Sequence, residues 1–166
     1  MQSQPTINRT PARNASRRRF GGRRFGGRRF GGATLEAALV VPFILLPLAF
    51  GTGEYGYYFF LKHTLQGAAR EGARAGITPT ATNADVTTAV TNYMTVAGLQ
   101  GSGYTTAIQN TSGGTINVSG YAAGSAIVVK VQCTWGTAGI RVLPTAMGGI
   151  SSGKVVVGQT VMRKEG

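Results

Sequence analysis

Two carboxylates interrupt an otherwise apolar part of the chain, and their placement has the clearest chemical consequence. Glu54 is the only charged side chain between Ala37 and Leu61, and Glu36 stands immediately before this stretch. A charged side chain in lipid is costly unless it finds a partner. Glu54 therefore either reaches the far membrane interface, because about 17 residues of helix rise about 25 Å, or pairs with another group, for example across subunits. The sequence leaves both interpretations open.

The other reactive side chains do not form a catalytic or metal-binding pattern. His63 is the only histidine and Cys133 the only cysteine, so the chain lacks the residues for a histidine/cysteine metal cluster. The segment 148–154, GGISSGK, approximates a phosphate-binding loop, but Val155 stands where a serine or threonine would hold magnesium. We therefore expect no enzymatic activity, no metal and no cofactor.

The apolar stretch predicts a membrane span. The hydrocarbon core of a bilayer is about 30 Å thick and needs about 20 apolar helical residues. We predict a transmembrane helix over residues 32–61, bendable because of its prolines and glycines, with an unwound segment near Gly51. Aromatic side chains close this stretch and predict an interfacial belt at its far end: Tyr55, Tyr57, Tyr58, Phe59 and Phe60.

The segment before the apolar stretch is strongly basic. Residues 1–32 hold nine arginines and no acid, and the unit RRFGG occurs three times between residues 18 and 32. One interpretation is an RNA-binding tail, in which arginines hold phosphates and phenylalanines stack on bases. The other, which we favour, is that arginines beside the span keep this end in the cytoplasm and contact anionic lipid headgroups. These arginines are Arg23, Arg24, Arg28 and Arg29, within a leader, residues 1–31, that we expect to be disordered.

Residues 62–166 predict an extracytoplasmic domain of α+β class. The long helix continues as an amphipathic helix, a second helix is expected over Ala84–Ala97 with Asn83 as N-cap and Asp85 as a first-turn acid, and a small antiparallel sheet of three or four strands follows. The expected strands are Thr105–Gln109, Ile116–Val118, Ser125–Trp135 and Lys154–Arg163. Small residues over Ala68–Gly76 predict close helix packing, which we assign to the domain's own sheet in preference to a partner.

The start of the apolar stretch resembles a known processing site. Residues 31–36, GGATLE, are similar to a type IV prepilin site, at which a membrane peptidase cuts after a glycine and a glutamate is fifth in the mature chain. With Gly32 as the first mature residue, Glu36 is the fifth. The wider run over residues 31–76 resembles the TadE-like pseudopilins of the tight-adherence pilus system, and Val161–Glu165 resembles the closing strand of that family more weakly.

The resemblance implies a minor pilin or pseudopilin in the cytoplasmic (inner) membrane or in a pilus, with its N-terminus cytoplasmic. Its implied partners are prepilin peptidase, acting at Gly31, Gly32 and Glu36, and other pilin-like subunits, packed through the transmembrane helix. Cleavage after Gly31 would free an amine at the start of an apolar helix, and Glu36 of a neighbour could neutralise it. The alternatives are an RNA-binding protein that uses the RRFGG tail and a plain membrane-tethered extracytoplasmic binding domain. We do not expect nucleic acid as a partner.

Overall fold

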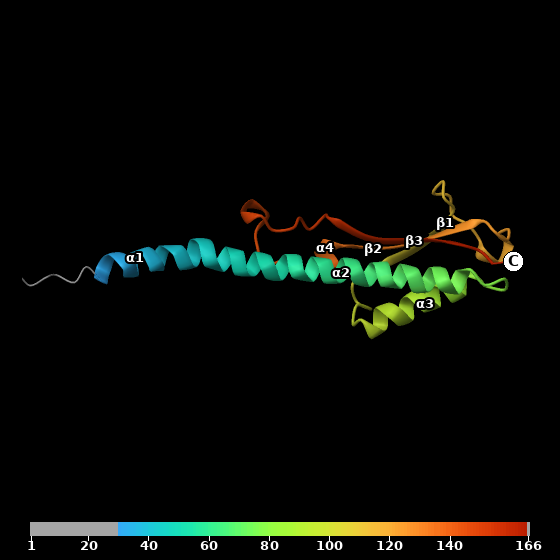
Figure 1. Ribbon diagram of the computed structural model, residues 1–166, viewed down its shortest axis with the longest axis horizontal. Helices are drawn as coiled ribbons and strands as arrows, with labels where there is room; N and C mark the ends of the chain where they lie inside the picture. The colour runs from blue at the N-terminus through green and yellow to red at the C-terminus, as the bar shows by residue number, and fades with distance from the viewer. Residues whose placement is uncertain (1–29, 166) are drawn as a thin grey trace, which may run out of the picture.

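A single long helical rod organises the molecule (Figure 1). The computed structural model describes residues 30–165. The rod consists of α1 (Phe30–Val40), a π-helical turn η1 (Val41–Leu45) and α2 (Leu46–Gly76). Residues 1–29 of the leader, with Arg23, Arg24, Arg28 and Arg29, lie outside the described residues, and α1 begins at Phe30, two residues before the predicted start of the helix.

The irregular turn falls earlier in the rod than the sequence predicts. Pro42 lies inside the π-helical turn, and a proline cannot donate the backbone hydrogen bond that a regular α-helix needs at this position. Gly51 lies within α2 and is helical, so the expectation of an unwound segment near Gly51 is wrong. The wider turn at Pro42 keeps the rod continuous.

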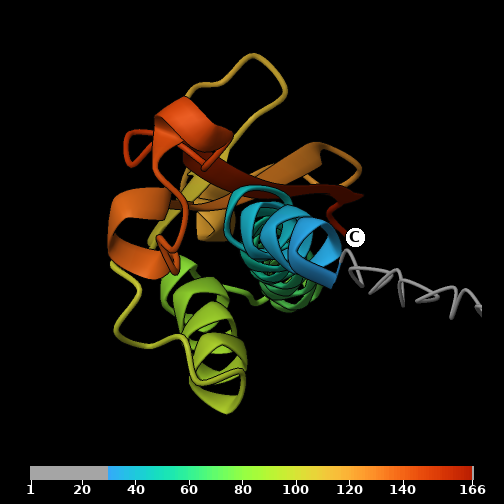
Figure 2. The same ribbon diagram turned by 90° about the vertical axis from the view of Figure 1, so that its left-hand side faces the viewer.

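The C-terminal half of the rod is part of a packed head. The head comprises the second half of α2, helix α3 (Asn83–Val96) and one antiparallel sheet in the order β1-β2-β3, with the sheet on one side of α2 and α3 on another (Figures 1 and 2). The strands are β1 (Thr105–Gln109), β2 (Ala126–Thr134) and β3 (Val155–Arg163). The predicted α+β class is confirmed, with three strands.

Helix α3 begins with a reciprocal cap. The Thr82 side chain accepts a hydrogen bond from the Asp85 N–H at 3.3 Å, and the Asp85 carboxylate accepts one from the Thr82 N–H at 2.8 Å. Thr82 is thus the N-cap, so the prediction of Asn83 is wrong by one residue. The predicted role of Asp85 as a first-turn acid is confirmed.

The side chain of Asn83 instead binds the backbone of residues 116–118, which were predicted to form a strand. Its amide donates to the Ile116 carbonyl and accepts from the Val118 N–H, at 3.2 and 2.8 Å. These contacts engage backbone groups of the segment, and the chain continues as a short 3₁₀ turn, η2 (Val118–Gly120). The expected fourth strand is therefore absent from the described residues.

The core lies between α2, α3 and the sheet, and close backbone approach is built into it. A Cβ on Gly72 would come within 2.6 Å of the Val90 side chain and 3.3 Å of Val129, so glycine permits both α3 and β2 to contact α2. A Cβ on Gly158 would meet the backbone of Leu65. The small residues of α2 thus pack within the protein's own head, against α3 as well as against the predicted sheet.

A side chain from the rod hydrogen-bonds to the outer edge of β3 near its middle. The amide of Gln66 donates to the Gln159 carbonyl at 2.7 Å and accepts from the Gln159 N–H at 3.2 Å. An open strand edge invites pairing with another chain. Gln66 occupies backbone groups that a further strand would use at this point, and it fixes the sheet to α2.

Candidate membrane anchor and assembly site

The N-terminal part of the rod extends beyond the head and is almost entirely exposed (Figure 1). In residues 34–46, here called the bare segment, every residue is exposed except the half-buried Val40. Phe43 is 72% exposed and Leu35 is 69% exposed. The rod is long and apolar enough to cross a membrane, and none of its most apolar window is buried. Apolar surface of this extent requires lipid or other apolar helices around it.

The predicted processing residues lie at the start of this segment. Gly31 and Gly32 belong to α1, and Glu36 is exposed one turn further along the rod. The structure therefore places the glycine pair and the glutamate on one continuous helix. Their role in cleavage stays a prediction.

Glu54 lies at the opposite end of the apolar stretch and is fully buried. Its Oε2 accepts hydrogen bonds from the backbone N–H groups of Val142 and Leu143, at 3.3 and 2.9 Å, and its Oε1 accepts one from Ile150 at 2.8 Å. Three donors offset much of the free energy needed to bury a carboxylate. The structure thus gives Glu54 a partner within its own chain, a loop between β2 and β3.

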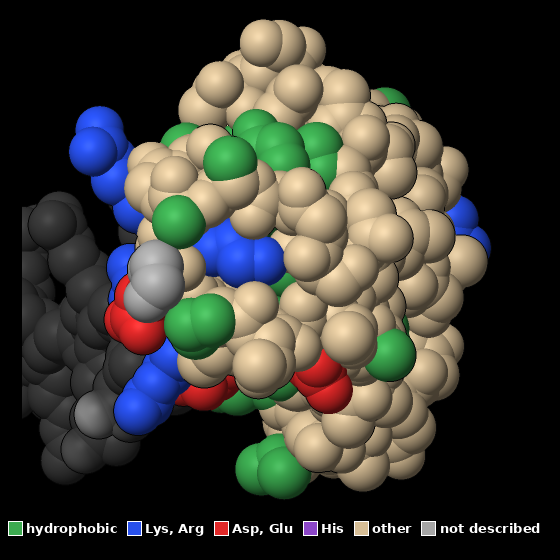
Figure 3. Space-filling model, turned by 90° about the vertical axis from the view of Figure 1, so that its right-hand side faces the viewer, with side chains coloured by type: hydrophobic (Ala, Val, Ile, Leu, Met, Phe, Trp, Pro, Cys, Tyr) green, Lys and Arg blue, Asp and Glu red, His purple; other side chains and the backbone are tan. Residues whose placement is uncertain are grey.

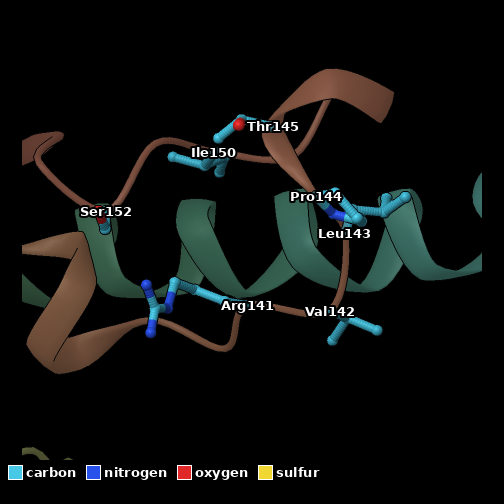
Figure 4. A pocket seen from close by; sticks show the side chains of 7 residues that line it. All are labelled: Arg141, Val142, Leu143, Pro144, Thr145, Ile150 and Ser152. Carbon is cyan, nitrogen blue, oxygen red and sulfur yellow. The ribbon is translucent and has the colours of Figure 1, made fainter.

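This loop, residues 139–150, is shaped to present those donors. It follows the short helix α4 (Trp135–Ala138) and contains a 3₁₀ turn, η3 (Thr145–Met147). Gly148 has a φ of 91°, and a Cβ on Gly149 would lie 2.1 Å from the Leu143 carbonyl oxygen. Two glycines therefore allow the chain to fold back on itself, and both arms of the loop face α2 (Figure 4).

Two further contacts hold the loop on α2. The Tyr55 hydroxyl donates to the Gly148 carbonyl at 3.1 Å, and the Leu143 side chain packs where a Cβ on Gly51 would be only 3.2 Å away. On the head side, the fully buried Trp135 packs against Tyr57 and Tyr58, with ring centroids 6.0 and 5.7 Å apart. The loop is thus fixed at the level of Gly51 to Tyr55.

Sequence reasoning missed this arrangement. It found Glu54 as a carboxylate in need of a partner, but backbone N–H groups leave no signal in residue types. The available signal was the turn chemistry of Pro144 followed by Gly148 and Gly149.

The remaining reactive residues lie apart from one another. His63 is exposed on α2, whereas Cys133 is buried in β2, where burial raises the pKa of its thiol. The segment 148–154 leads into β3, so it lacks the helix N-terminus on which a phosphate-binding loop depends. Among residues 30–165, no three His, Cys, Asp or Glu side chains gather in a way that could hold a metal ion.

The described residues form an apolar helix, exposed at one end, that continues into a small α+β head. Residues 31–74 match a family model described as TadE-like protein, which confirms the resemblance over this stretch. The matched residues take in all of the bare segment, Glu36 and Glu54, and most of α2. No curated protein and no solved structure matches the chain.

Proposed function

We propose that this protein is a membrane-anchored minor pilin or pseudopilin that takes part in assembly of a tight-adherence pilus or a related secretion machine. It acts through assembly and not through catalysis. The single observation that supports this most strongly is the bare segment, whose exposed apolar side chains lie within the TadE-like stretch. Lipid surrounds this segment before assembly, and the helices of other pilin-like subunits surround it afterwards.

The dimensions of the rod fit this proposal. From Gly32 to Gly51, about 20 residues of helix rise about 30 Å, which equals the hydrocarbon thickness of a bilayer. We infer that the hydrocarbon ends near Gly51, before Leu61, because Leu61 is fully buried in the core of the head. The exposed side chain of Tyr55, about 6 Å further along the helix, then lies at headgroup level, where aromatic residues are favoured.

The orientation and partners follow the same scheme. The arginines of the leader hold the N-terminus in the cytoplasm and contact anionic lipid, and the head lies on the other side of the membrane. Prepilin peptidase cuts between Gly31 and Gly32. Glu36 then meets the new N-terminus of a neighbouring subunit.

Membrane fractionation tests the anchor. We expect the wild-type chain to stay with membranes after alkaline carbonate extraction. The double variant Leu39→Arg, Leu45→Arg places two charges at exposed positions of the bare segment and should shift most of the protein to the soluble fraction, since an arginine at the centre of a span costs about 2.5–3.5 kcal/mol on insertion scales.

Thr91→Arg is the matched control, because Thr91 is exposed on α3 in the head. It adds the same side chain without touching the bare segment and should fractionate as wild type does. Carbonate-resistant membrane association of the double arginine variant would argue against an anchor at this position.

A further inference from the structure

The loop 139–150 exposes apolar side chains that the fold does not use. Ile140, Val142 and Met147 are 47, 48 and 54% exposed. Surface loops are ordinarily rich in polar residues. The opposite end of the head, by contrast, is mostly polar or backbone surface with hydrophobic side chains scattered among it (Figure 3).

The loop also lies at a particular height on the rod. Its contacts with Gly51, Glu54 and Tyr55 fix it beside α2, and the rod on its N-terminal side is the bare segment. Figure 1 shows the same arrangement, with the loop reaching along the rod towards α1. If the anchor described above spans the hydrocarbon from Gly32 to Gly51, the loop meets the membrane surface on the side of the head.

The backbone of the loop suits such a position. Irregular backbone is poorly tolerated near hydrocarbon because unpaired N–H and C=O groups lose their hydrogen bonds to water. Glu54 accepts from three loop N–H groups, and the N–H groups of Met147, Gly148 and Gly149 donate to carbonyls of Pro144 and Thr145 within the loop. Much of the loop can therefore leave water without leaving donors unpaired.

The charge of the loop and the groove beside it are also consistent with contact with a membrane surface. The loop contains Arg141 and no acid, which fits anionic headgroups. In Figure 4 the Arg141 side chain extends towards the side on which Ser152 lies, and Ser152 leads into β3 of the head. In the proposed orientation the guanidinium is therefore directed away from the hydrocarbon, as in a snorkelling arginine. An apolar groove of about 490 Å³ lies between the loop and α2, lined by residues that include Leu48, Leu143 and Met147.

We propose that the loop 139–150 is a second membrane contact, seated at the boundary of lipid headgroups and acyl chains, with Ile140, Val142 and Met147 inserted and Glu54 holding the loop in place. The partner is a phospholipid surface. This inference rests on the proposed membrane anchor. Two contacts, one through the rod and one beside it, restrict tilting of the head relative to the membrane.

Nitroxide labels on the full chain, carrying Cys133→Ala, test the contact in vesicles of phosphatidylcholine and phosphatidylglycerol. Single cysteines replace Phe43 in the bare segment, Met147 in the loop and Ser112, which is exposed after β1. Accessibility to oxygen, which concentrates in lipid, is compared with accessibility to a water-soluble nickel chelate. We expect the oxygen-to-nickel ratio to be highest at residue 43, several-fold lower but clearly raised at 147, and lowest at 112.

The label positions separate the inference from the anchor. A ratio at 147 equal to that at 112, with 43 in lipid, would overturn the loop contact and leave the anchor standing. A label at 147 that is shielded from both reagents would also overturn it, since a second protein would then cover the loop. An aqueous label at 43 would overturn the anchor and this inference with it.

A further variant tests the part played by Glu54. Glu54→Gln keeps the shape of the side chain but replaces one acceptor oxygen with a donor, which opposes at least one loop N–H. We expect the label at 147 to become more mobile and more accessible to nickel, while the label at 43 does not change. An unchanged depth at 147 would overturn the role of Glu54 in holding the loop.

Discussion

At the residue scale, the two carboxylates of the apolar stretch differ in how they are satisfied. Glu54 is buried and accepts three hydrogen bonds from its own chain, whereas Glu36 is exposed on the bare segment. An exposed carboxylate in an apolar environment needs a cation. This contrast assigns Glu54 to the structure of the subunit, and it is consistent with the predicted role of Glu36 in processing or in contact between subunits.

We predict that Glu36→Ala still inserts into the membrane but loses processing or incorporation into the pilus. Alanine removes the charge and keeps helix propensity, so the rod itself should be preserved. N-terminal sequencing of membrane-bound protein is the measurement: wild type should begin at Gly32. Glu71→Ala removes an exposed acid from the head end of α2 and serves as control. Normal maturation and incorporation of Glu36→Ala would contradict the prediction.

At the scale of elements, helix α3 makes part of the stability of the head dependent on pH. Backbone and side-chain hydrogen bonds from Thr82 hold the pKa of Asp85 below its ordinary value. A carboxyl group with a lowered folded-state pKa stabilises the fold above its unfolded pKa of about 3.9, and this contribution is lost as the pH falls through the folded pKa.

We therefore predict that Asp85→Asn lowers the melting temperature at neutral pH and that its difference from wild type narrows as the pH is lowered below about 4. Thermal unfolding followed by circular dichroism between pH 7 and 3 measures this. Glu71→Gln, which removes an exposed acid from α2, should follow the wild-type profile. Parallel melting profiles of Asp85→Asn and wild type over the whole range would show that the cap contributes no charge effect.

The elements also show how far the sequence alone can lead. The length of the apolar stretch predicted the N-terminal part of the rod, and a repeating apolar face predicted α3 and β2. All five inward-facing side chains of Ile127 to Trp135 are buried as expected. The N-cap at Thr82 was missed although the sequence carries its signal, since Thr82 and Asp85 have the spacing of a capping box. The loss of the 116–118 strand could not be predicted in this way, because it depends on which partner Asn83 finds in space. The contact between Glu54 and the loop 139–150 was also missed, because the hydrogen-bond donors to Glu54 are backbone groups 88 to 96 residues away.

At the scale of the whole molecule, the head and the bare segment differ in how their side chains are packed. The head is held together by contacts within the chain: Gln66 hydrogen-bonds to the backbone of Gln159 at the edge of β3, and the small residues of α2 pack internally. The bare segment, by contrast, leaves its apolar side chains exposed, and these require lipid or other helices around them. In the proposed function, assembly therefore runs through the rod.

Photo-crosslinking from the bare segment tests this claim most directly. A photoreactive residue replaces Phe43, which is 72% exposed, in cells that assemble the pilus, and a second variant carries it at Ser112 in the head. We predict that position 43 forms covalent adducts with a second copy of this chain or with another pilin-like subunit, and that position 112 does not form these adducts. Adducts of position 43 with lipid alone, while the pilus assembles normally, would contradict assembly through the rod.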